Sequence, residues 1–95
     1  MLIETPYKNG DTISLKLSSG EEVVARLEEE KEGELKISKP LMLTATQEGF
    51  GLAPFMFTVS PESNIVLNTD NVLCVVKTEE TMANQYLQNT TGISV

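Results

Sequence analysis

The stretch IVLNTDNVLCVVK, residues Ile65–Lys77, contains two apolar runs that flank a polar corner. β-Branched residues dominate both runs, Ile65–Leu67 and Val72–Val76, and such residues suit a pleated, buried surface. The corner between them, Asn68–Asn71, consists of residue types that bond to their own backbone and tolerate tight turns. The pattern predicts two core strands joined by a sharp corner, which is the first place to look for a binding site.

Alternating apolar residues upstream of this stretch predict further strands. Asp11–Leu17 and Glu21–Glu29 both alternate, and the turn signal Ser18-Ser19-Gly20 between them predicts a hairpin. Leu35–Thr46 carries apolar residues at most odd-numbered positions, which predicts one long strand with a single buried face. Pro40 lacks the backbone N–H that a sheet requires, so it predicts a bend or bulge within that strand.

The middle of the chain is less regular. Gln47–Pro54, QEGFGLAP, has two glycines around Phe50 and predicts a flexible loop. Phe50 would either swing onto a nucleobase or a partner, or fold back over the core, and the preference of aromatic side chains for burial favours the core. Phe55–Ser60 alternates again and predicts a short strand, in which Phe55 and Phe57 share one face.

The two ends of the chain differ from this β pattern. Met1–Gly10 contains Pro6 and a turn signal, and predicts a short arm that docks through its apolar residues Leu2, Ile3 and Tyr7. Thr78–Gln88 predicts a short amphipathic helix that starts at Thr78, with Met82 and Tyr86 on one side. The predicted organisation is therefore an arm (1–10), a β domain (11–77) and a helix with a tail (78–95).

Five short strands joined by turns, followed by a helix, predict an all-β fold. We expect a strongly bent, five-stranded antiparallel sheet that forms a small open barrel, plus the short C-terminal helix. An open sheet leaves edges, and an apolar edge such as Val72–Val76 needs a partner strand. A 95-residue chain with 40% apolar residues also has a modest core. Edge pairing between copies answers both needs, and head-to-tail repetition closes into a ring.

The composition restricts the function. Fourteen acidic and seven basic residues give a net charge of −7, so the chain has no general attraction for nucleic acid or anionic membranes. Histidine is absent, and the single cysteine, Cys74, lies in an apolar run that predicts a buried, inert thiol. With no phosphate-binding glycine loop either, we expect neither an enzyme nor a cofactor.

The acidic run Glu28–Glu34 predicts a solvated hairpin tip. Its spacing does not match a calcium loop, so we expect no metal site there. No apolar run approaches the roughly 20 residues of a membrane span. The lack of a disulfide pair and of a signal-like N-terminus favours a reducing, cytoplasmic location.

The segments Ile13–Leu27 and Ile65–Val76 resemble the two motifs of the Sm/LSm family. The first is a strand, a glycine-containing turn and a second strand; the second is two apolar strands around a short polar turn. The irregular middle and the C-terminal helix also resemble the Sm-like proteins of marine phage origin, for which the location would be the host cytoplasm. The resemblance implies a small barrel, a homo-oligomeric ring and binding of single-stranded RNA or DNA, with a role in its processing.

The sequence departs from the family at its binding loops. The Asp and Asn that follow the second strand in the family are replaced here by Glu30–Gly33, and the Arg-Gly of the second motif falls at Asn68-Thr69. Amides still offer a donor and an acceptor to a base edge. The candidate nucleic-acid-binding residues are Asn68, Thr69, Asp70, Asn71, Lys31 and Phe50.

The candidate residues of the subunit interface are Val72, Leu73, Val75, Phe55 and Phe57. Met82 and Tyr86 are candidates for contact with a protein partner through the C-terminal helix. Two functions stay open: a ring that binds single-stranded nucleic acid, and a structural or protein-interaction ring that does not. A monomeric barrel of another small family is the third alternative.

Overall fold

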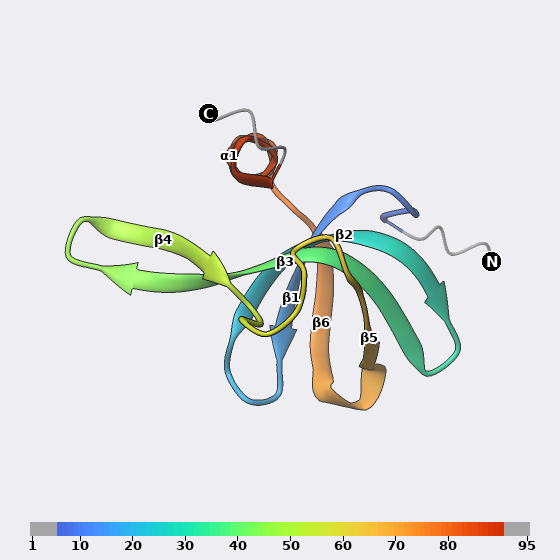
Figure 1. Cartoon of the computed structure of the whole chain (residues 1–95). Coiled ribbons are helices and arrows are strands. Elements are labelled where there is room, and N and C mark those ends of the chain that lie inside the picture. Colours follow the sequence, from blue (N-terminus) through green and yellow to red (C-terminus); the bar gives the residue numbers. More distant parts are fainter. Residues whose placement is uncertain (1–5, 91–95) are drawn as a thin grey trace.

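The computed structural model describes residues 6–90, which form six strands and one α-helix (Figure 1). The elements are β1 (Thr12–Leu17), β2 (Glu22–Lys31), β3 (Glu34–Thr46), β4 (Gly49–Pro54), β5 (Asn64–Asn68), β6 (Val72–Lys77) and α1 (Glu80–Thr90). A single 3-10 turn, Thr69–Asn71, joins β5 to β6.

All strand pairs are antiparallel, and the order is β4-β3-β2-β1-β6, with β5 also paired to β3. β3 is long enough to hold two partners in succession: β5 pairs with residues 34–38 and β4 with residues 41–46. The sheet bends strongly but does not close (Figure 1). The expected all-β fold, an open barrel with a C-terminal helix, is confirmed, with six strands in place of five.

The segment after β3 differs from its prediction. Residues 49–54, predicted as a loop, form β4, whereas residues 55–60, predicted as a strand, belong to an irregular connection. The end of β3 offers an unpaired edge, and pairing with it outweighs the low strand preference of the glycines. Phe50 lies opposite Ala45 and is 79% exposed, so it does not fold over the core.

The core is built from the predicted hairpin. β1 and β2 alternate as expected, with Leu15 opposite Val23, and their buried side chains pack with the start of β3. The core cluster is Ile13, Leu15, Leu17, Val23, Ala25, Leu27, Leu35 and Ile37. Tyr7 packs against this cluster, as predicted for the arm, whereas Leu2 and Ile3 lie outside the described residues.

A bulge at Lys39 and Pro40 divides β3 into two halves. Ser38 pairs with Arg26 and Leu41 pairs with Val24, so two β3 residues lie opposite one residue of β2. Lys39 has a φ of 51°, in the left-handed region. The irregularity expected at Pro40 is confirmed, but the single buried face is wrong, because the extra residue turns Leu41 to the face opposite the core.

The helix begins two residues later than predicted. The Glu79 carboxylate accepts hydrogen bonds from the backbone N–H groups of Thr81 (3.0 Å) and Met82 (3.2 Å), and these bonds lower the pKa of Glu79. Glu79 therefore caps the helix, the role expected of Thr78. The Thr78 side chain is instead buried, and its hydroxyl lies 2.9 Å from that of Ser14 on β1.

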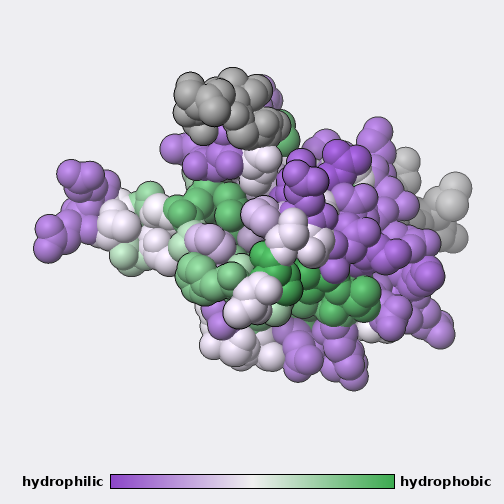
Figure 2. All heavy atoms as spheres, in the orientation of Figure 1, coloured by the Kyte–Doolittle hydropathy of each residue, from purple (hydrophilic) through white to green (hydrophobic). Residues whose placement is uncertain are grey.

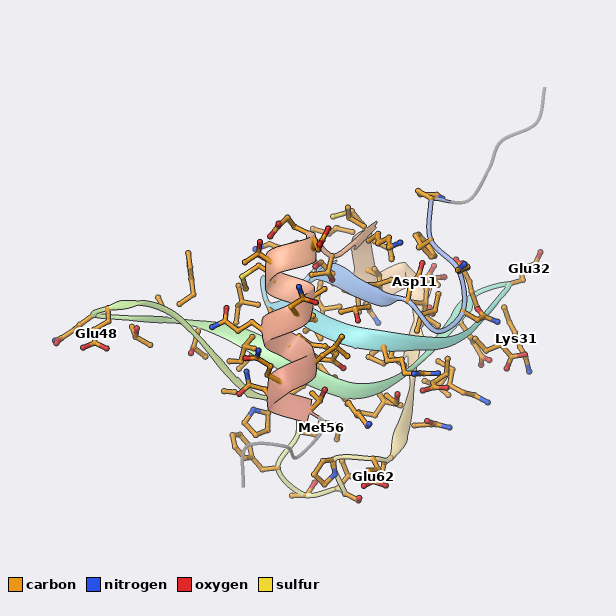
Figure 3. All side chains as sticks on the ribbon, turned by 90° about the horizontal axis from the view of Figure 1, so that it is seen from above. Asp11, Lys31, Glu32, Glu48, Met56 and Glu62 are labelled. Carbon is orange, nitrogen blue, oxygen red and sulfur yellow. The ribbon has the colours of Figure 1, made fainter. Side chains whose placement is uncertain are left out.

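Tyr86 fastens α1 to the sheet. Its side chain is buried, and its hydroxyl donates to the backbone carbonyl of Lys39 at 2.7 Å. Figure 3 shows the helix crossing over β2 and β3. Tyr86 was expected to join Met82 in contacting a protein partner, but it contacts its own sheet and is not available for one.

Titration of Tyr86 is expected to destabilise the protein at high pH. Burial raises the pKa of the phenol from 10.0 to about 12. Between these values the unfolded chain loses the proton and the folded chain keeps it, so the free energy of unfolding falls as pH rises. When the free energy of unfolding is measured by urea titration from pH 9 to pH 12, it should decline less steeply for Tyr86→Phe than for the wild type. Burial and the nearby Glu30 also raise the pKa of Tyr7. Because Tyr7 is present in both proteins, its effect is the same in each. Equal slopes would contradict the prediction.

Candidate nucleic-acid interface

Three turns meet at one end of the barrel, the lower end in Figure 1. The backbone N–H of Thr69 donates to the Gly33 carbonyl in the β2–β3 turn at 3.1 Å. The N–H of Ser18, in the β1–β2 turn, donates to the Asn71 carbonyl at 2.8 Å. The corner Asn68–Asn71 is therefore held on both sides, and Glu34 lies opposite Asn68 in the strand register.

The corner is as sharp as the sequence predicts. The Asn68 side-chain oxygen accepts from the Asp70 N–H at 2.9 Å, and the Val72 N–H donates to the Thr69 carbonyl. Asn68 thus uses one of its polar atoms to shape the turn. Asn68, Asp70 and Asn71 are exposed and therefore accessible to a ligand, whereas Thr69 is half-buried.

Negative charge surrounds the corner. Glu32, Glu34 and Asp70 are all exposed on the joined turns. The Lys31 ammonium lies 3.8 Å from a Glu29 carboxylate oxygen, so a phosphate would compete with that carboxylate for Lys31. Within residues 6–90, no three Cys, Asp or Glu side chains gather closely enough to hold a metal ion.

The candidate binding residues do not all lie together. Lys31 and the corner share the end with the three turns, whereas Phe50 lies on the hairpin formed by β3 and β4. In Figure 3, Lys31 and Glu32 lie at one end of the sheet and Glu48, at the hairpin tip, lies at the other. Phe50 therefore cannot act on the same nucleotide as Asn68–Asn71.

Two strands flank the corner, and each is paired on one side only within residues 6–90. β5 pairs with β3, and β6 pairs with β1. Figure 2 shows patches of hydrophobic residues in the region of β5 and the 55–63 connection, with hydrophilic residues beside them. The exposed apolar side chains of the two edge strands are Val66 (53%), Leu73 (67%) and Val76 (56%).

The five predicted residues of the subunit interface fall into two groups, those that face the core and those that face solvent. Val72, Val75 and Phe55 pack against the core, whereas Leu73 and Phe57 (81%) are exposed. Val66 and Val76 are exposed on the same strands but were not among the predicted candidates. The alternation along β5 could have indicated Val66, whereas β6 does not alternate, because its pairing with β1 shifts register opposite Lys16 and Leu17.

The burial predicted for Cys74 is wrong. It is exposed because its position on β6 lies opposite the exposed Lys16, on the outer face of the sheet.

No family model matches the sequence, and no curated protein matches it. A solved heptameric archaeal Sm protein is similar in structure, with a TM-score of 0.52 and 14% sequence identity. The likeness covers 75% of this chain and 90% of that protein. The chain has the Sm fold. The resemblance of Ile13–Leu27 and Ile65–Val76 to the Sm motifs is thereby confirmed at the level of the fold.

Within this Sm fold, β1 and β2 form the first motif, and β5, the corner and β6 form the second. The helix follows the last strand and lies across the outer face of the sheet (Figure 3). Among residues 6–90, no helix is both long and apolar enough to cross a membrane.

Proposed function

We propose that this Sm-like protein forms a ring and binds single-stranded nucleic acid weakly at the corner Asn68–Asn71. The observation that carries the proposal is the pair of half-paired strands, β5 and β6, on either side of that corner. The similar archaeal Sm protein is heptameric, so this fold is compatible with ring assembly, and that supports the proposal.

Edge pairing gives the assembly its geometry. A half-paired strand presents a row of unused N–H and C=O groups, and β5 and β6 add exposed valine and leucine side chains to it. Because the two edges differ, pairing β5 of one copy with β6 of the next leaves the same two edges free at the ends. Such a heterologous contact repeats until the ring closes.

Light scattering tests the assembly directly. We expect a particle several times heavier than the 10.4 kDa of one chain. A particle of about that single-chain mass at all concentrations would overturn the ring.

The ring would place one corner from every subunit around a common axis. Individual contacts through Asn68 and Asn71 amides are expected to be weak, because no arginine is present there to hold a phosphate. Several such contacts on one flexible strand add through effective concentration.

The acidic side chains near the corner provide a test of where nucleic acid binds. The double variant Glu32→Gln, Glu34→Gln should bind labelled oligouridylate or oligoadenylate about threefold more tightly at low salt, because two repulsive charges are removed. Fluorescence anisotropy is the measurement. Glu62→Gln, in the connection before β5 and apart from Lys31, Glu32 and Glu48, is the matched control and should not change the affinity (Figure 3).

Equal effects of the corner and control variants would place binding elsewhere. Absence of wild-type binding at about 50 µM protein and low salt would overturn nucleic-acid binding itself, because non-specific dissociation constants of roughly 1–100 µM at physiological salt become lower as the salt is reduced.

The second candidate function is a structural or protein-interaction ring without nucleic acid. The net charge of −7 and the acidic turns favour it, since both oppose a polyanion. A ring that forms by light scattering but binds no oligonucleotide would select this alternative.

A further inference from the structure

A second site lies between α1 and the β3–β4 hairpin. This groove has a volume of about 190 Å³ and is lined by Leu43, Phe50, Gly51, Leu52, Met82, Gln85 and Asn89. It is smaller than the roughly 300–1,000 Å³ of sites for drug-sized ligands, which suits one flat ring system.

The backbone places these side chains together. Leu43 lies opposite Leu52, and Phe50 is two residues from Leu52, so all three share one face of the hairpin. Met82, Gln85 and Asn89 are three and four residues apart and share one face of α1.

The helix is held beside the hairpin by a contact next to the groove. Tyr86 follows Gln85 directly, and its hydrogen bond to the Lys39 carbonyl ties this part of α1 to β3. The groove is thus a consequence of packing between two ordered elements and does not depend on a flexible loop.

The lining combines a stacking surface with hydrogen-bonding groups. Phe50 lines the groove and is 79% exposed, so its ring is accessible for stacking, while the side-chain amides of Gln85 and Asn89 line the groove on the helix side. The Asn89 side-chain nitrogen donates one hydrogen bond to the backbone carbonyl of Gln85. Within residues 6–90, the Asn89 side-chain oxygen and the Gln85 side-chain amide make no hydrogen bond. Both groups can therefore form hydrogen bonds with a ligand in the groove.

The absence of charge from the lining selects the ligand class. None of the seven lining residues is ionisable, in a chain with a net charge of −7. The groove therefore lacks a cation to hold phosphate, and its aromatic ring and amides match the face and the edge of a base.

We infer that this groove binds one unpaired nucleobase, stacked on Phe50 and hydrogen-bonded by Gln85 and Asn89. The groove is separate from the corner at the other end of the sheet, and each would contact a different nucleotide of one strand. Because stacking and neutral hydrogen bonds do not release counterions, the contribution of this site depends little on salt.

Tryptophan variants test the site, because the chain contains no tryptophan. Phe50→Trp should keep the stacking and show quenched fluorescence when oligoadenylate is added. Phe57→Trp is the matched control, since Phe57 is 81% exposed but lies outside the groove. Phe50→Ala should weaken oligoadenylate binding about tenfold at both low and high salt. Equal responses of the two tryptophan variants, or unchanged affinity in Phe50→Ala, would overturn the inference.

Adenosine separates this site from the proposed function, because it carries a base without phosphate. Millimolar adenosine should shift the methyl NMR signal of Met82. It should leave unchanged the signal of Met56, which lines another pocket of about 290 Å³ beside Pro40 and Ile65 that shares only Asn89 with the groove. A Met82 shift supports the groove even if oligonucleotides do not bind the corner. No Met82 shift overturns the groove and leaves the corner to be judged by the glutamine variants.

Discussion

Replacing Leu73 and Val76 with aspartate is expected to reduce the assembled protein to single chains. Both side chains lie on β6, and they are 67% and 56% exposed in one chain. Edge pairing would enclose them against the next subunit, where unpaired carboxylates cost roughly 3–5 kcal/mol per interface. Light scattering should return 10.4 kDa for the double variant.

The fold of one chain should tolerate these changes. Neither residue belongs to the core cluster, so circular dichroism should remain that of the wild type. Leu87→Asp is the control: Leu87 is 45% exposed but lies on α1, away from both edges, and its replacement should leave the mass of the particle unchanged.

The exposed Cys74 thiol, between the two replaced residues, gives a second measurement. Its alkylation should be slow in the assembled wild type and fast in the double variant. A double variant with the wild-type mass would show that β6 does not carry the assembly.

Replacing Tyr86 with alanine is expected to cost about 3–5 kcal/mol of unfolding free energy, as for other large aromatic side chains in cores. Tyr86 is one of the largest fully buried side chains, at 1% exposure, and α1 reaches the bulge through it. Small domains have only about 5–15 kcal/mol of stability, so the variant should unfold near the start of a urea titration.

Two further variants separate packing from hydrogen bonding. Tyr86→Phe removes only the bond to the Lys39 carbonyl and should cost about 1 kcal/mol. Leu87→Ala, at the next and largely exposed position, should cost much less than Tyr86→Ala. Equal losses for Tyr86→Ala and Leu87→Ala would mean that the helix does not depend on this anchor.

The parts of the fold that follow from local alternation were predictable. The β1–β2 hairpin places Leu15 opposite Val23 as its pattern requires, and the polar residues Asn68–Asn71 form the expected turn. In both, the side-chain period and the turn chemistry agree, so no distant contact is needed to specify the structure.

The parts that depend on distant pairing were not predictable. β4 forms because the end of β3 is free to pair with it. The glycine-containing sequence of residues 49–54 does not itself indicate a strand or its pairing with β3. The Tyr86 anchor joins residues 47 positions apart. For the same reason, the groove beside Phe50 could not be predicted, because its two walls come from elements that only the folded chain brings together.

The bulge at Lys39 and Pro40 also makes the two halves of β3 independent modules. Before it, β3 contributes to the barrel; beyond it, the strand belongs to an arm whose apolar face is turned toward α1. Insertions or deletions of two residues in each strand of this arm preserve its alternation and leave the barrel register unchanged. The arm can therefore change length, and with it the reach of its tip, without altering the strands on which assembly would depend.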